Sequence, residues 1–186
     1  MKKSIIFIAI IATGLLGILA WQNWFGSQKP KTAITNFEEC VAAGNAVMES
    51  YPRQCRAGGE LFVEHIGNVN EKADLIRLTT PRPNATIKSP LIVKGEARGN
   101  WFFEASFPVS LTNWDGLILA EGIATAEGEW MTTEFVPFTA TLNFTNPAAE
   151  ASNEAYAKRG TLILKKDNPS GLPEHNAALE IPVLFE

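Results

Sequence analysis

The sequence predicts a mainly β protein in which a β-sandwich follows a membrane-spanning helix and a small disulfide-tied segment. From residue 75 onward, short alternating apolar and polar runs are separated by turn residues about every ten positions, as in a sandwich. Near the start of the chain, residues 5–21 form an almost unbroken apolar run. The only two cysteines, Cys40 and Cys55, lie between these regions. These features divide the chain into an anchor at 1–25, a tether at 26–33, a Cys-pair segment at 34–66, a linker at 67–74 and a sandwich at 75–186.

Residues 1–25 have the pattern of an export signal that stays in the membrane as an anchor. Lys2 and Lys3 precede the apolar run, and a run of this length can span a bilayer. The cleavage position is poor because Ile18 stands where a small residue is preferred. We therefore expect an uncleaved single-pass helix with its N-terminus in the cytoplasm and the bulk of the chain outside. Two alternatives are a cleaved signal, which would make the protein secreted, and a helix buried in a core.

The Cys-pair segment, residues 34–66, is too short to bury a large core. Thr35 or Asn36 can cap a short helix, and Gly58-Gly59 is typical of a hairpin turn. An even number of cysteines in an exported chain predicts one disulfide between them. The alternative is two buried free thiols.

Residues 95–109 are the most aromatic stretch of the predicted sandwich. Strand alternation predicts an inward face made of Phe103, Ala105, Phe107 and Val109. Phe102 then faces the other way, and Trp101 belongs to the turn before the strand. Because exposed aromatic side chains are common anchors for partners, we predict a recognition role for Trp101 and Phe102. The alternative is that both pack in the core.

A polar, proline-containing loop supplies the other candidate binding residues, which are Asp167, Asn168, Ser170 and His175. Oxygen atoms of such residues can ligate calcium, but their spacing does not match the calcium-loop pattern. Asx-type turns that shape the loop explain these residues better. We therefore expect a binding loop without a metal ion.

The charge and motif content argue against several classes of function. The chain has 16 basic and 20 acidic residues, and the part beyond the predicted anchor is acidic without a basic stripe, which argues against a nucleic-acid partner. Its two histidines lie in different segments, and the sequence contains no nucleophile elbow, metalloprotease motif or phosphate-binding loop. We expect a protein that is not an enzyme and has no cofactor. A carbohydrate-active enzyme with a carboxylate pair is a further alternative.

A series of motifs in the predicted sandwich carries a family resemblance. In chain order they are Ile76 to Pro83, Ser89-Pro90-Leu91, Val93 to Ala97, Trp101 to Val109, Asp115-Gly116, Glu129-Trp130-Met131, Phe135, Pro137-Phe138, Gly160-Thr161-Leu162 and Asp167 to Gly171. Together they resemble the bacterial spore germination immunoglobulin-like domain family. The resemblance implies an immunoglobulin-like β-sandwich at the bacterial envelope that is a non-catalytic module. With the predicted anchor, it leads us to expect a protein of the bacterial cell membrane that binds or organises an envelope protein or glycan.

The Cys-pair segment carries a second, more limited resemblance. Its stretches Tyr51-Pro52-Arg53-Gln54-Cys55 and Gly59-Glu60-Leu61-Phe62 are similar to the hairpin of Kazal inhibitors, which contain more cysteines than this chain. This resemblance implies a protease inhibitor that acts through residues 51–56, and it is the alternative function.

Overall fold

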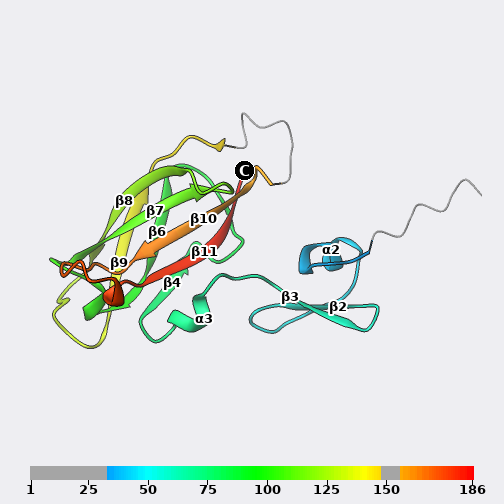
Figure 1. The fold of residues 1–186 in the computed structure, drawn as a ribbon, viewed down its shortest axis with the longest axis horizontal. Helices are drawn as coiled ribbons and strands as arrows, with labels where there is room; N and C mark the ends of the chain where they lie inside the picture. Colours follow the sequence, from blue (N-terminus) through cyan, green and yellow to red (C-terminus); the bar gives the residue numbers. More distant parts are fainter. Residues whose placement is uncertain (1–32, 148–155) are drawn as a thin grey trace, which may run out of the picture. The chain divides into compact units, whose positions relative to one another are not determined.

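The computed structural model describes residues 33–147 and 156–186 (Figure 1). The chain divides into two compact units, which we call the Cys-pair unit (Met1–Glu49 and Gln54–Phe62) and the sandwich unit (Ser50–Arg53 and Val63–Glu186). The predicted membrane helix, residues 1–25, lies outside the described residues and stays a prediction. Within the described ranges, no helix is both long enough and apolar enough to cross a membrane.

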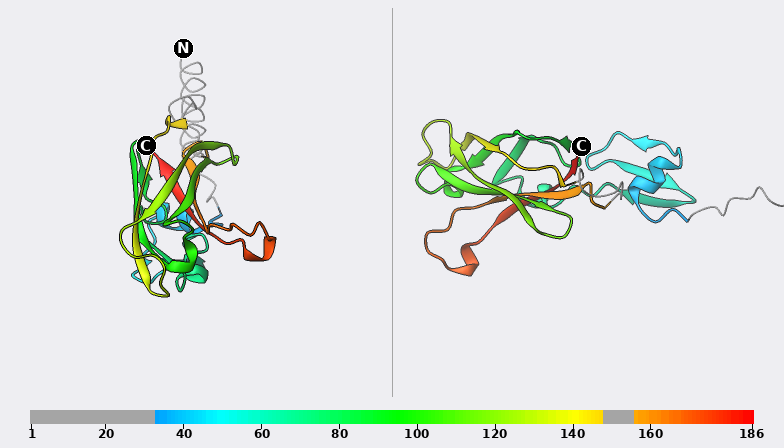
Figure 2. Two further views of the ribbon diagram at one scale, coloured as in Figure 1. Left: turned by 90° about the vertical axis from the view of Figure 1, so that its left-hand side faces the viewer. Right: turned by 90° about the horizontal axis from the view of Figure 1, so that it is seen from above.

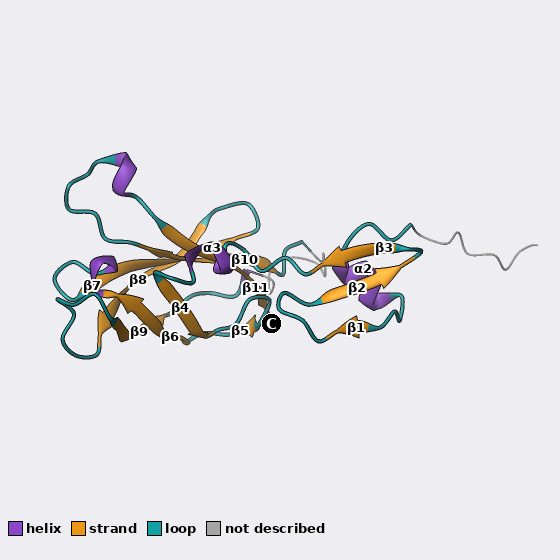
Figure 3. Ribbon diagram, turned by 90° about the horizontal axis from the view of Figure 1, so that it is seen from below, coloured by secondary structure: helices purple, strands orange, loops and turns teal. Residues whose placement is uncertain are grey.

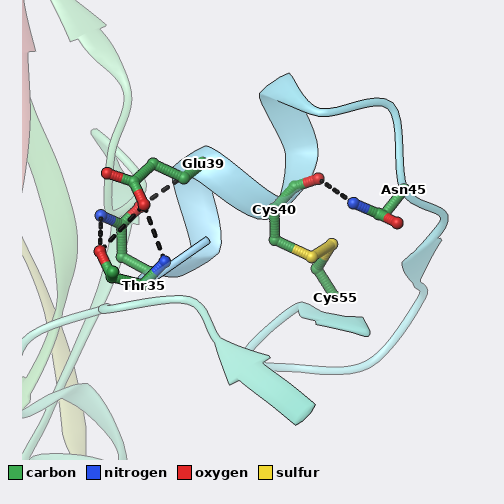
Figure 4. Close-up of a disulfide and its surroundings, with 6 residues drawn as sticks. Thr35, Glu39, Cys40, Asn45 and Cys55 are labelled. Atoms are coloured by element: carbon green, nitrogen blue, oxygen red, sulfur yellow. Dashed lines mark hydrogen bonds between the residues drawn. A yellow bond between two sulfur atoms is a disulfide. The ribbon is translucent and has the colours of Figure 1, made fainter. Parts of the chain in front are cut away.

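The Cys-pair unit combines one short helix with a small antiparallel sheet. Its elements are α2 (Phe37–Ala42), β1 (Val47–Met48), β2 (Gln54–Ala57) and β3 (Glu60–Val63), with the strands in the order β1-β2-β3. The helix begins after Asn36, whose side-chain oxygen accepts a hydrogen bond from the Glu39 backbone N–H at 2.8 Å. Glu39 in turn accepts hydrogen bonds from the backbone N–H and hydroxyl of Thr35 at 2.8 and 2.9 Å (Figure 4). The bond from Glu39 satisfies an N–H group that a helix start leaves without a partner, and the two bonds from Thr35 tie the preceding chain to the first turn.

The predicted disulfide is confirmed. Cys40 of α2 and Cys55 of β2 are bonded to each other, with their Cα atoms 6.1 Å apart, as Figure 4 shows. Both cysteines are fully buried next to Phe37. The Asn45 side chain donates to the Cys40 carbonyl at 2.9 Å and so satisfies a carbonyl at the end of the helix.

The segment predicted as a linker, residues 67–74, contains the short helix α3 (Val69–Lys72). Asn68, just before it, binds the outer edge of β11 (Ala178–Phe185): its side chain donates to the Ala178 carbonyl at 3.0 Å and accepts from the Glu180 N–H at 2.8 Å. Gly67 permits this approach, because a Cβ there would lie 1.9 Å from the Glu180 carbonyl oxygen. Asn68 therefore occupies backbone groups that an open strand edge would expose.

The strands of the sandwich unit form one continuous hydrogen-bonded sheet, which folds over into two facing layers (Figures 2 and 3). Besides β11 its strands are β4 (Ile76–Thr80), β5 (Thr86–Ile87), β6 (Leu91–Arg98), β7 (Ser106–Asn113), β8 (Ile118–Ala126), β9 (Phe135–Leu142) and β10 (Arg159–Lys165). The order is β4-β6-β9-β8-β7-β10-β11-β5. Only two residue pairs join β8 to β9, where one layer passes into the other.

The core lies between the two layers. Phe107 of β7 and Phe138 of β9 meet edge to face with ring centroids 4.9 Å apart, although their strands are not neighbours in the sheet order. Contact between non-neighbouring strands is what sheet-on-sheet packing produces. The prediction of a mainly β chain with a sandwich of short strands is therefore confirmed.

Candidate binding surface

The candidate binding surface comes from two segments that are far apart in the sequence. One is the turn between β6 and β7, which contains the 3₁₀-helix Gly99–Trp101. The other is the loop of residues 166–177 between β10 and β11, which contains the 3₁₀-helix Pro173–His175. The Asp167 N–H donates to the Trp101 carbonyl at 3.1 Å and joins the two segments. The structure thus brings together the two stretches in which the sequence analysis placed its candidate residues.

Trp101 and Phe102 do not face solvent. Trp101 is fully buried, and its indole Nε1–H has no hydrogen-bond partner among the described residues. Phe102 is 4% exposed and packs on Phe107, with ring centroids 5.2 Å apart. The expectation that Phe102 faces outward is wrong, and the core alternative describes both side chains.

Phe103 is the exposed aromatic of this stretch, with 42% of its surface accessible. The prediction that Phe103 and Ala105 begin the inward face of a strand is also wrong, because β7 starts only at Ser106. Phe103 and Ser106 exchange two backbone hydrogen bonds of 3.0 Å, and the two residues between them have positive φ angles of 49° and 59°. This tight turn interrupts strand alternation. As a result Phe102 is buried and Phe103 is exposed, the reverse of what alternation predicts.

A shallow hollow of about 350 Å³ lies between the two segments. From the turn it is lined by Asn100, Phe102 and Phe103, and from the loop by Lys166, Asp167, Asn168, Pro169, Ser170 and His175. Four of the six predicted site residues line it from the loop, together with Phe102, whereas Trp101 does not. We call this hollow and its lining the Phe103 surface. Sequence reasoning missed Phe103, Asn100 and Lys166, and only recognition of the tight turn could have pointed to Phe103.

Three of the predicted loop residues hold the loop in shape. Ser170 Oγ donates to the Asn168 side-chain oxygen at 2.5 Å and lies 3.0 Å from His175 Nδ1. The Asn168 amide donates to the Leu172 carbonyl and to the Asn176 side-chain oxygen, both at 2.8 Å. These bonds form the Asx-type loop that the sequence predicts.

Three other side chains of the Phe103 surface are free to bind. The Asn100 amide, the Lys166 ammonium and the Asp167 carboxylate make no side-chain hydrogen bond or ion pair within the described part of the chain. They offer both donors and acceptors. Asp167 is the one carboxylate lining the hollow, whereas a glycosidase mechanism uses a pair.

The loop of the inhibitor alternative is exposed, with Tyr51 63% accessible, but its Arg53 is engaged by another residue of the chain. The Arg53 guanidinium donates to both carboxylate oxygens of Glu64, from Nε at 2.8 Å and from Nη2 at 2.6 Å. The Arg53 backbone N–H and the Asn84 side-chain amide also donate to Glu64, at 3.4 and 3.1 Å. The hydrogen bond from Arg53 is the main cause that lowers the pKa of Glu64, against an opposing effect of burial. This geometry gives the inhibitor alternative no support, because Arg53 is held in an internal ion pair.

The strand pairing defines the sandwich as immunoglobulin-like. Strands β4, β6 and β9 pair as strands A, B and E of that fold do, and β7, β10 and β11 pair as strands C, F and G do. Residues 75–158 match the family model of the immunoglobulin-like domain of bacterial spore germination. The resemblance found in the sequence is therefore confirmed, and it suggests a non-catalytic module. Comparison with curated proteins and with solved structures gives no significant match.

Proposed function

We propose that this protein is a non-catalytic binding module of the bacterial envelope, anchored in the cell membrane by residues 1–25, that binds a glycan through the Phe103 surface. The observation that carries the proposal is an exposed aromatic ring beside three unpaired polar groups of different kinds. The ring of Phe103 offers an apolar platform, and the amide, ammonium and carboxylate around it donate and accept hydrogen bonds.

A sugar matches this chemistry better than a protein surface does. A sugar ring has an apolar face of C–H groups and a rim of hydroxyls that both donate and accept. Protein interfaces instead concentrate their binding energy in large side chains buried in well-packed pockets, and the hollow is shallow with one exposed ring.

The envelope location is supported by two features of the chain. The disulfide between Cys40 and Cys55 is typical of an oxidising compartment outside the cytoplasm. The apolar run preceded by Lys2 and Lys3 is typical of an anchor with its N-terminus inside. Protease treatment of intact spheroplasts tests the orientation: the described residues should be degraded, whereas an epitope before Lys2 should be protected. Release of the protein into the medium would favour the cleaved-signal alternative.

Binding to isolated cell-wall glycan tests the function. The full chain in detergent is mixed with purified sacculi and sedimented, alone and as the variants Phe103→Ala and Asp167→Asn. Loss of the ring is expected to weaken binding about tenfold, a difference of about 1.4 kcal/mol, with a smaller loss for Asp167→Asn. Ile123→Ala is the matched control, because Ile123 is also an exposed apolar residue but lies on β8 outside the hollow.

The outcomes separate the alternatives. Equal sedimentation of the Phe103→Ala variant and the wild type would show that the Phe103 surface is not the binding site. No binding to glycan, together with a cross-linked protein partner that requires Phe103, would assign the surface to a protein.

A further inference from the structure

The tip of the β7–β8 hairpin carries a group of exposed apolar side chains. Trp114, Leu117 and Ile118 are all more than half exposed, and Leu117 reaches 64%. Tyr156, from the turn before β10, is also exposed, and its ring lies against Trp114 with centroids 4.8 Å apart. We call these four residues the hairpin patch. Exposed apolar groups gathered in one place mark interaction surfaces.

The hairpin tip is held in a defined conformation. The Asn113 side-chain oxygen accepts from the backbone N–H groups of Asp115 and Leu117 at 3.0 and 2.9 Å. The Asn113 N–H donates to the Leu117 carbonyl at 3.0 Å, and Gly116 supplies a positive φ of 80°. The turn thus holds Trp114 and Leu117 outward in a defined conformation, so that binding does not require a flexible loop to become ordered.

Basic residues flank the patch in a part of the chain that is otherwise acidic. Lys158 and Arg159 follow Tyr156 and are both exposed, and Gly160 pairs directly with Asn113 at the base of the tip. Asp115, at the apex, is the acidic residue of the turn. A patch with Trp, Tyr and two aliphatic side chains, flanked by two bases, has the composition of surfaces that lie in the headgroup region of a bilayer.

We propose that the hairpin patch rests on the lipid surface of the membrane in which the chain is anchored. Trp114 and Tyr156 lie at the headgroup level, Leu117 reaches toward the acyl chains, and Lys158 and Arg159 bind the phosphates of anionic lipids. Asp115 keeps the tip from deeper insertion, because a carboxylate is costly in hydrocarbon. The contact would fix which face of the sandwich unit points into the envelope. This inference rests on the anchoring proposed above.

Site-specific photo-cross-linking in proteoliposomes tests the contact. The full chain is reconstituted into vesicles of phosphatidylcholine and phosphatidylglycerol with p-benzoylphenylalanine in place of Leu117 or, as the control, of Ile123, which is 57% exposed on β8 but outside the patch. After photolysis, mass spectrometry counts lipid adducts on each peptide. We expect adducts at position 117 at several times the yield at position 123, and a lower yield at 117 when Lys158→Ala and Arg159→Ala are combined. Lys94→Ala, which removes an exposed base on β6, should leave the yield unchanged.

Three results would overturn the inference: equal lipid yields at the two positions, adducts at position 117 with a second copy of the chain, or adducts there with the chain's own residues 148–155. Carbonate extraction after photolysis tests the anchor separately. Because the adducts form before extraction, a chain that is stripped from the vesicles disproves the anchor, while the adduct yield still reports on the hairpin patch.

Discussion

In the Cys-pair unit the fully enclosed cluster consists of Phe37 and the two bonded cysteines, whereas the sandwich unit buries apolar side chains from every strand from β4 to β11. The difference follows from size, because a segment of this length cannot remove enough apolar surface from water to fold on burial alone. The smaller unit depends instead on one covalent bond and on hydrogen bonds at the ends of α2. Stability should therefore respond to different substitutions in the two units.

The largest effect is expected from the sandwich core. Phe138 is 1% exposed and meets Phe107 across the two layers, so Phe138→Ala leaves a cavity and should destabilise the sandwich unit by about 4 kcal/mol. Hydrogen exchange followed by mass spectrometry should show lost protection in β7 and β9. Phe62→Ala, at a half-buried phenylalanine of the Cys-pair unit, is the matched comparison and should cost much less. Equal losses would mean that both units depend on burial alike.

The disulfide should matter next. Replacing Cys40 and Cys55 together by serine opens a loop of 15 residues, which costs about 3 kcal/mol in the chain-entropy model. Protection of α2 and β2 is expected to disappear, while protection of β7 and β10 stays at the wild-type level. Unchanged exchange in α2 after the substitution would show that hydrogen bonds alone hold the Cys-pair unit.

The ion pair between Arg53 and Glu64 tests the boundary between the two units. Both residues belong to the sandwich unit, although the sequence analysis placed them within the Cys-pair segment. Glu64→Gln should cost about 2 kcal/mol, the value of hydrogen bonds to a charged group. The folded pKa of Glu64 lies below its ordinary value, so its contribution is fully present above a pH of about 4.3 and is lost as the pH falls through the folded pKa.

Urea unfolding of the wild type from pH 6 to pH 3 measures this dependence, and the Glu64→Gln variant should lose part of the slope. Glu174→Gln serves as the control, because it removes an exposed carboxylate of the loop of residues 166–177 that makes no side-chain hydrogen bond or ion pair with the described residues. Identical pH profiles for Glu64→Gln and wild type would remove Glu64 from the list of groups that stabilise the sandwich unit.

The sequence predicted the features that depend on composition and period. Alternation of apolar and polar residues from residue 75 onward predicted the strands, and the presence of two cysteines predicted the disulfide of the Cys-pair unit. Alternation failed between Phe103 and Ser106, because it assumes an uninterrupted strand and the tight turn shifts the alternation by one position. Neither Glu104 nor Ala105 signals such a turn, since positive φ at both central residues is typically served by Asn-Gly. The sequence also did not predict that Asn100, Lys166 and Asp167 lie together around Phe103. Which loops lie side by side depends on the order of the strands in the sheet, and the sequence pattern does not give that order.

This turn gives the smallest but most specific prediction. Glu104 and Ala105 have φ angles of 49° and 59°, a region that disfavours residues with a Cβ by roughly 1–2 kcal/mol each. Ala105→Gly should therefore stabilise the sandwich unit by about 1 kcal/mol, after the greater chain entropy of glycine is deducted, and adding Glu104→Asn should increase the gain. Ala126→Gly, at a half-buried alanine in β8, should instead destabilise, because glycine in a strand loses more conformational freedom on folding.

If both glycine variants destabilise the sandwich unit alike, the turn between Phe103 and Ser106 stores no strain. If Ala105→Gly stabilises the sandwich unit and also weakens glycan binding through Phe103, then the strained turn holds Phe103 in its binding position. The free energy stored in the turn would then be the reason why Phe103 is exposed, although strand alternation assigned it to the core.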